Sequence, residues 1–270
     1  MNNLLKADFF RVLKSKLTYI SFSIALAFPL LIAVLIFVVN LFIIYTYKQE
    51  VGTTEGVENA LLTSSMFIKS SLSISSNIGI AIPIFSSIFI NMDISNGSLR
   101  NKIIYGKNRS TIYLSHLVVS ICYNVALITI YFLSTVLFTS IFLPYGTEFN
   151  TNEVLNIIYL YINGIMSFAF IATITVFFSF VFKSVAPTII LTIVVMYVVT
   201  FGSLLQLFAN DYIVYAIPLF ANGTYTGSAV FGSSGDFDLV LFFEGLLSLL
   251  AFGTLNTVLG IKIFEKSDIK

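Results

Sequence analysis

Long runs of apolar residues alternate along the chain with shorter stretches in which polar and charged residues gather. Each run is about 20 residues or longer, the length that a helix needs to cross a hydrocarbon layer of about 30 Å. The runs show no alternation with the period of a strand, which disfavours a transmembrane β-barrel. The pattern predicts six membrane-spanning helices, over residues 18–44, 72–92, 114–142, 155–182, 186–208 and 239–263.

The chain as a whole is strongly apolar. Of its 270 residues, 57% are hydrophobic and 10% are charged, and the mean hydropathy is +0.97. Soluble domains carry about 25% charged residues, so the composition excludes a soluble fold. The first apolar run exceeds the core of a signal peptide and no small-residue cleavage pattern follows it, so we expect it to be retained. We expect a single all-α transmembrane domain over residues 1–270.

The positions of lysine and arginine predict how the helices are oriented. Four basic residues precede the first run, four lie between the second and third runs, and three occupy the C-terminal tail. By the positive-inside rule, both termini and the loop between the second and third helices are cytoplasmic. We expect a multi-pass protein of the cell membrane. The absence of tryptophan beside 28 phenylalanine residues indicates a low-GC coding bias, which favours a Gram-positive bacterium.

Several kinds of site are excluded by the residues that the chain lacks. With one cysteine, Cys122, and one histidine, His116, it can build neither a disulfide nor a Cys/His metal cluster by itself, and we expect both residues to serve in packing. No phosphate-binding loop of the form G-x-x-x-x-G-K-[ST] occurs, because Gly106 and Lys107 are followed by Asn108. We therefore expect no catalytic residue, metal or cofactor on this chain.

The loop between the second and third runs has a finer pattern than topology requires. Leu99, Ile103 and Ile104 fall on one face at helical spacing, residues 95–96 offer an N-cap, and Gly106 stands where a left-handed residue would end a helix. The pattern predicts an amphipathic helix of about two turns, which is too short to be stable unless something packs against it.

The stretch 93–115 resembles the loop after the second helix in permeases of the type-2 ATP-binding-cassette (ABC) exporter family. An acid, a glycine, a basic helix, a second glycine and an arginine recur in both. In that family the loop forms a coupling helix that seats in a groove of a separate nucleotide-hydrolysing subunit. The resemblance implies an ATPase contact for Asp93, Gly97, Leu99, Arg100, Lys102, Ile103, Ile104, Gly106 and Arg109.

The N-terminal segment, residues 1–17, is basic and amphipathic. It predicts a helix along the inner membrane face, and in the resembling family such an interface helix also borders the ATPase. A membrane-surface anchor without a partner is the open alternative. The apolar stripe holds Leu5, Phe9, Val12 and Leu13, and the polar side holds Arg11 and Lys14.

Polar residues inside the predicted spans mark either a substrate path or contacts between helices. They are Ser75, Ser76, Asn77, Asn124, Asn163, Glu244 and Asn256. Glu244 lies close to the outer end of its span, so both a role in transport and a contact with outer headgroups stay open. Residues 208–239 are too apolar for a free loop and predict a re-entrant or interfacial element, which in the resembling family closes the outward exit.

The resemblance implies the membrane subunit of an ATP-driven exporter. ATP and Mg²⁺ would be bound by partner ATPase subunits, beside a second permease chain of the same or a different kind. The cargo would be an amphiphile such as an antimicrobial peptide, as in small peptide-export and antibiotic-immunity permeases, and no nucleic acid is expected. Three alternatives remain open: an ABC exporter of drugs or lipids, a gradient-driven transporter or channel, and a membrane-bound assembly or sensor protein. A gradient-driven carrier favours buried acids, and only Glu244 approaches that pattern.

Overall fold

The structure is a computed structural model of the chain, and it describes residues 2–51, 53, 56–72, 77–146, 149–204 and 239–267. These residues form helices and connecting loops, with no strand among them. The elements in order are α1 (Asn2–Lys14), α2 (Lys16–Val51), the 3₁₀ helix η1 (Val57–Ala60), α3 (Ser64–Ser70), α4 (Asn77–Ser95), α5 (Ser98–Ile104), α6 (Arg109–Phe142), α7 (Thr151–Phe182), α8 (Val185–Leu204) and α11 (Leu239–Lys266).

Within the described residues, four helices are long and apolar enough to cross a membrane. They are Lys16–Val51, Ile78–Ser95, Arg109–Phe142 and Thr151–Phe182, and a shorter apolar helix covers Val185–Val198. The expected all-α fold is thereby confirmed for the described residues, with four helices that are candidates for membrane spans. The last apolar run, 239–263, coincides with α11, which begins at the same residue.

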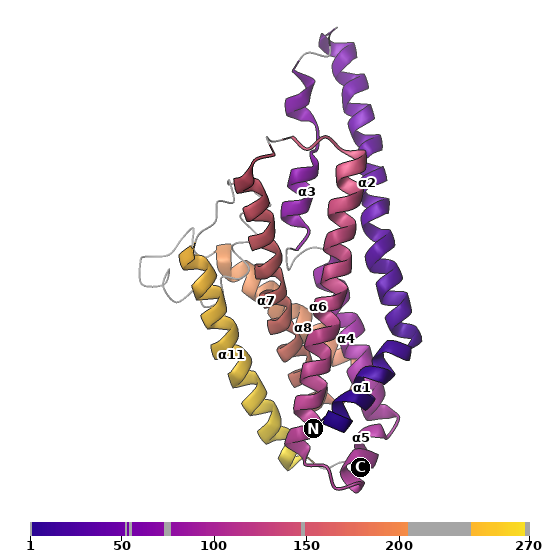
Figure 1. Ribbon diagram of the computed structural model, residues 1–270, viewed down its shortest axis with the longest axis vertical. Helices are drawn as coiled ribbons and strands as arrows, with labels where there is room; N and C mark the ends of the chain where they lie inside the picture. Colours follow the sequence, from indigo (N-terminus) through magenta and orange to yellow (C-terminus); the bar gives the residue numbers. More distant parts are fainter. Residues whose placement is uncertain are drawn as a thin grey trace.

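The long helices lie side by side in an elongated bundle (Figure 1). α6 packs between α2 and α7, and α11 packs along α7. α1 and α5 lie together at the lower end in Figure 1, whereas α3 lies in the upper half. The bundle therefore has an α5 end and an α3 end, and we use these two names below.

Helix boundaries differ from the apolar runs mainly where polar residues begin. α2 continues to Val51 although its apolar run ends at residue 44, and α6 begins at Arg109 rather than at residue 114. A hydropathy pattern ends at the first polar residues, but backbone hydrogen bonding continues through them wherever the side chains reach a polar environment. Four helices, α2, α6, α7 and α11, are accordingly longer than the runs that predict them.

The described part of the stretch between α2 and α4 is packed rather than free, which the apolar pattern did not indicate. α3 lies in it and buries Ser64, Ser65 and Ile68 against α6 and α7. Asn40 on α2 fixes the preceding turn, because its Nδ2 donates to the carbonyl of Leu62 (2.9 Å) and its Oδ1 accepts from the Leu62 amide (3.0 Å).

α5 forms where the amphipathic pattern predicts it. Gly106 has a φ of 75° and ends the helix, which confirms its expected left-handed role. The N-cap predicted at residues 95–96 is wrong, because α4 continues through Ser95 and the Asn96 amide still donates to the Met92 carbonyl (3.0 Å). Gly97 takes the N-cap position instead, with a φ of 70° that favours glycine.

The element expected between the fifth and sixth spans, and the whole stretch 205–238, lie outside the described residues.

Candidate functional site

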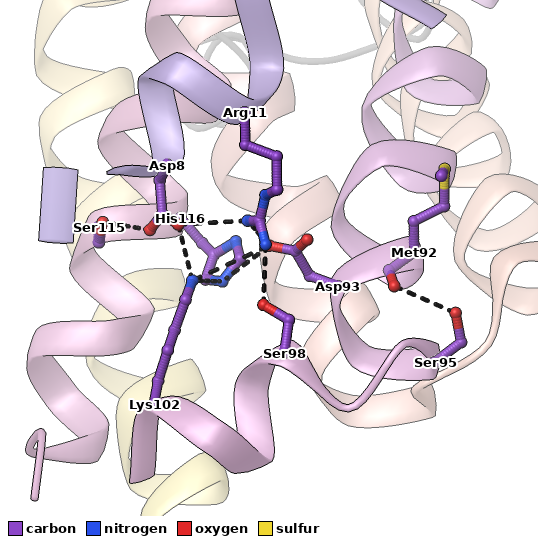
Figure 2. Close-up of polar contacts among 9 residues, drawn as sticks. All are labelled: Asp8, Arg11, Met92, Asp93, Ser95, Ser98, Lys102, Ser115 and His116. Carbon is purple, nitrogen blue, oxygen red and sulfur yellow. Dashed lines mark hydrogen bonds and ion pairs between the residues drawn. The ribbon is translucent and has the colours of Figure 1, made fainter. Parts of the chain in front are cut away.

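Polar side chains from α1, α4, α5 and α6 meet at the α5 end of the bundle (Figure 2). We call this set the polar junction. Its members are Asp8, Arg11, Asp93, Ser98, Lys102, Ser115 and His116.

Asp8 on α1 is the first centre of the junction. Only 2% of the residue is exposed. Lys102 Nζ and Ser115 Oγ donate to its two carboxylate oxygens at 2.8 and 2.7 Å, and Arg11 Nη2 donates at 3.2 Å. Burial alone would raise the pKa of Asp8, but the hydrogen bond and the charge of Lys102 outweigh it, so the pKa lies below its usual value. Asp8 is therefore a buried, ionised carboxylate at neutral pH.

Asp93, near the end of α4, is the second centre, and it is 4% exposed. Arg11 Nη2 donates to its Oδ2, and Lys102 Nζ and His116 Nε2 lie 3.9 and 3.5 Å from the same oxygen. Arg11 also donates to Ser98 Oγ at the start of α5 (2.8 Å). A single guanidinium thus ties α1 to both α4 and α5.

The charges of the junction are balanced. Two carboxylates face Arg11 and Lys102, and Lys102 Nζ also lies 3.3 Å from His116 Nε2. A buried ion pair is costly to break, because removing one partner leaves the other charge without compensation, at about 3–5 kcal/mol. The junction therefore fixes the position of α5 against α1, α4 and α6.

His116 and Cys122, both expected to serve in packing, have different surroundings. His116 is buried and meets the Phe180 ring edge-on at 5.6 Å, which confirms that it packs in the core, and it also joins the polar junction. The packing expectation is wrong for Cys122, which is exposed on α6. Within the described part of the chain, no group of three or more His, Cys, Asp or Glu side chains is arranged to hold a metal ion.

The residues of α5 divide into an inward and an outward set. Leu99 is buried in the core of this chain, and Ile103 packs against that core. Arg100 points outward, with Ile104 and Tyr105 69% and 84% exposed. The structure therefore does not bring all the apolar residues of the loop to the surface, and the side chains open to a partner are Arg100, Asn101, Ile104 and Tyr105.

Arg109, at the start of α6, holds the end of α11. Its Nη1 donates to the carbonyls of Phe264, Glu265 and Ser267 at 3.0, 2.9 and 2.7 Å. Phe264 and Glu265 belong to the last turn of α11 and Ser267 follows it directly, a place where a cation is favourable. Arg109 was grouped with the ATPase contacts by resemblance, and the structure gives it this intramolecular role.

α1 is amphipathic, but its buried face differs from the predicted stripe. Leu4, Asp8 and Val12 are buried at helical spacing, with Leu5 and Phe9 packed partly against the core. Leu13 is exposed, and so is Lys14, whose Nζ lies 4.4 Å from the centre of the Phe10 ring. Arg11, expected on the polar side, turns inward to Asp93.

Of the predicted substrate-path residues, the structure describes the side chains of Asn124, Asn163 and Asn256. Asn124 is buried, accepts a hydrogen bond from Ser86 Oγ (2.6 Å) and lies 3.4 Å from the Phe168 carbonyl, so it joins α4, α6 and α7. Asn163 is buried and Asn256 is half-buried. Ser75 and Ser76, with the side chains of Asn77 and Glu244, lie outside the described residues.

A small cavity of about 130 Å³ lies between α2, α3 and α6. Its polar lining consists of hydroxyl groups, which sequence reasoning missed because single Ser and Thr residues are common in apolar helices. These residues are Ser70, Ser71, Tyr131, Thr135 and Thr139.

A second charged cluster lies at the α3 end. Lys69 Nζ on α3 pairs with Glu153 Oε1 on α7 at 2.9 Å. The same oxygen accepts from Ser65 Oγ at 3.1 Å and from the Tyr145 hydroxyl at 3.5 Å. We call this set the α3-end cluster.

A scan against protein-family models and a search of curated proteins both find no match for this chain.

Proposed function

We propose that the chain is the transmembrane subunit of an ATP-driven exporter, with six spans and with the α5 end in the cytoplasm. The observation that carries the proposal is the setting of α5. This helix of 7 residues is anchored by buried charges, yet it presents Arg100 and Ile104 to the outside, and its C-cap residue Tyr105 is exposed beside them. Contiguous exposed apolar side chains can mark a surface that receives a partner.

The anchoring supports a role in transmitting movement. A loop that served only to connect two spans would need no buried ion pairs. Because Lys102 and Ser98 connect α5 to Asp8 and Arg11 on α1, a displacement of α5 must either move α1 or break these contacts. A partner that pushes on α5 could thus move the ends of several long helices together.

The partner in this proposal is an ATPase that binds ATP and Mg²⁺, since the chain itself has no phosphate-binding loop. The resemblance of residues 93–115 to a coupling loop supports this identification. We further propose a complex with a second permease chain, in the cell membrane of a Gram-positive bacterium, and export of an amphiphile such as an antimicrobial peptide.

The test compares two substitutions on the exposed side of α5. Ile104→Asp places a charge on the proposed contact, and Asn101→Asp places the same charge at a neighbouring exposed position. We expect Ile104→Asp to lower co-purification of the ATPase about 30-fold or more, as for an interface hot spot, and Asn101→Asp to lower it far less. The readout is mass spectrometry of proteins that co-purify in mild detergent.

The same variants separate the transporter classes. If the chain, purified alone into liposomes, moves cargo along an ion gradient and Ile104→Asp has no effect, a gradient-driven transporter replaces the exporter. If neither the chain nor its complex moves any amphiphile, the result supports a membrane-bound assembly or sensor protein.

Orientation is tested by labelling single cysteines in a background with Cys122→Ala, because Cys122 is the one native cysteine of the chain. A membrane-impermeant reagent applied from outside should label Thr147→Cys but not Lys107→Cys. Labelling of position 107 from outside would overturn the topology.

A further inference from the structure

A cavity of about 580 Å³ opens beside the polar junction, between α1, the start of α2 and the end of α4. Its basic lining comes from Arg11, Lys14 and Lys16, and its apolar lining includes Leu17, Phe89 and Met92. No part of the proposed function uses this cavity.

The charge of the cavity favours an anion. Asp93 is its one acidic lining residue, and Arg11 already pairs with that carboxylate. Lys14 and Lys16 are exposed and have no ion-pair partner among the described residues. Two uncompensated ammonium groups therefore remain at the mouth of the cavity.

The apolar side of the cavity favours a ligand that is also oily. Met92 is exposed to 44%, and Phe10 and Leu13 on the adjoining face of α1 are exposed to 60% and 59%. Apolar side chains exposed to this extent are unfavourable in water but favourable against acyl chains. The positive and the apolar parts together fit an amphiphile with an anionic head.

The position of the cavity selects among anionic amphiphiles. α2 and α4 are both candidate membrane spans, and the cavity lies where α2 begins and α4 ends. This is the level of the lipid headgroups, where basic pockets between helices bind anionic lipids. At this level the polar ends of α2 and α4 would meet the hydrocarbon of the bilayer.

We propose that this cavity binds one anionic phospholipid. Its phosphate group would lie against Lys14 and Lys16, and an acyl chain would lie along Leu17, Phe89 and Met92. Arg11 belongs both to the cavity wall and to the polar junction, so a bound lipid would stabilise α1 in the position that the junction requires.

The test uses the purified full-length chain in detergent, with vesicles of phosphatidylglycerol or of phosphatidylcholine as the lipid source. Native mass spectrometry measures bound lipid, and thermal unfolding measures protection. We expect phosphatidylglycerol to bind and to raise the unfolding temperature, and phosphatidylcholine to do neither. Inorganic phosphate should give no protection, because it lacks the acyl chain.

The double variant Lys14→Gln/Lys16→Gln should lower the affinity for phosphatidylglycerol about tenfold or more, since each basic residue near a membrane surface contributes substantially to binding. Lys6→Gln/Lys107→Gln removes the same charge from exposed positions outside the cavity and should leave the affinity within about twofold. Met92→Glu, on the opposite wall, should weaken binding as well.

Equal loss in both lysine variants would mean non-specific attraction and would overturn the site. Unchanged binding of phosphatidylglycerol in Lys14→Gln/Lys16→Gln would also overturn the site. The same holds if this variant loses a co-purifying protein while its bound lipid stays the same. The proposal does not depend on transport, so a chain that binds no ATPase can still be tested for this lipid.

Discussion

At the α5 end of the bundle, two carboxylates and two cations from α1, α4 and α5 are interlocked, with Ser115 and His116 of α6 against them. At the α3 end, one ion pair joins Lys69 to Glu153. The side chains of Asp8 and Asp93 are 3% and 5% exposed, whereas that of Glu153 is 12% exposed. Among the cations, Lys102 and Arg11 are 13% and 36% exposed, and Lys69 is 24% exposed. The contrast therefore lies in the carboxylates, which are more deeply buried and pair with more cations at the α5 end than at the α3 end.

This difference fits the division of labour in the proposed exporter. An end that must pass on movement from a partner needs its helices fixed to one another. An end that faces the outside needs only to close the bundle. The difference also predicts how unequally the two ends respond to the loss of a charge.

The largest effect is expected from breaking the Asp8–Lys102 pair. Asp8→Asn keeps the shape of the side chain but leaves Lys102 less compensated, which should cost about 3–5 kcal/mol of unfolding free energy. Lys102→Met should cost a similar amount. The double variant Asp8→Asn/Lys102→Met should lose clearly less unfolding free energy than the two single variants together, because neither charge is then left without its partner. Unfolding of the purified variants in detergent measures all three.

Additive losses below about 1 kcal/mol each would show that the pair behaves as a surface salt bridge. The α5 end would then not differ from the α3 end in the way described. Cleavage by a protease near Ser15, between α1 and α2, gives a local readout, because a weakened junction should release α1 before the rest of the bundle unfolds.

A smaller effect is expected from Arg109→Ala, which removes the donor to three carbonyls at the end of α11. We expect a loss of about 1.5–3 kcal/mol, the range for hydrogen bonds to a charged group. Faster amide hydrogen exchange should be confined to the last turn of α11. Lys107→Ala, at an exposed position nearby, serves as the control and should change neither quantity.

The smallest effect is expected at the α3 end. Glu153→Gln removes the charge that pairs with Lys69 but leaves an amide oxygen for Ser65 Oγ, so the loss should stay near 1 kcal/mol or below. Glu58→Gln, at an exposed position of η1, is the matched control. A loss as large as that of Asp8→Asn would remove the contrast between the two ends.

Much of the fold could be predicted because membrane-spanning helices have a strong signal in single sequences. Each long apolar run corresponds to a helix, and the small helix α5 begins and ends within a few residues of its predicted position. α3 escaped prediction, since its residues Ser64–Ser70 carry no helical apolar stripe and are held by α6 and α7. Local pattern cannot show an element that tertiary packing alone maintains.

The candidate site was harder to predict than the fold. Asp93 and Lys102 were selected for a contact with a partner, but their main contacts lie within the chain. Lys102 and Asp8 are 94 residues apart in sequence, and no local rule pairs them. The spacing of Asp8 between Leu4 and Val12 is the one signal that could have placed this acid on the buried face of α1.

The 36 residues of α2 have one further consequence. At a rise of 1.5 Å per residue the helix is about 54 Å long, and the 34 residues of α6 reach about 51 Å. A hydrocarbon layer of about 30 Å cannot enclose them at ordinary tilts of up to about 40°. The ends of these two packed helices therefore extend beyond the hydrocarbon layer and reach at least into the headgroup region.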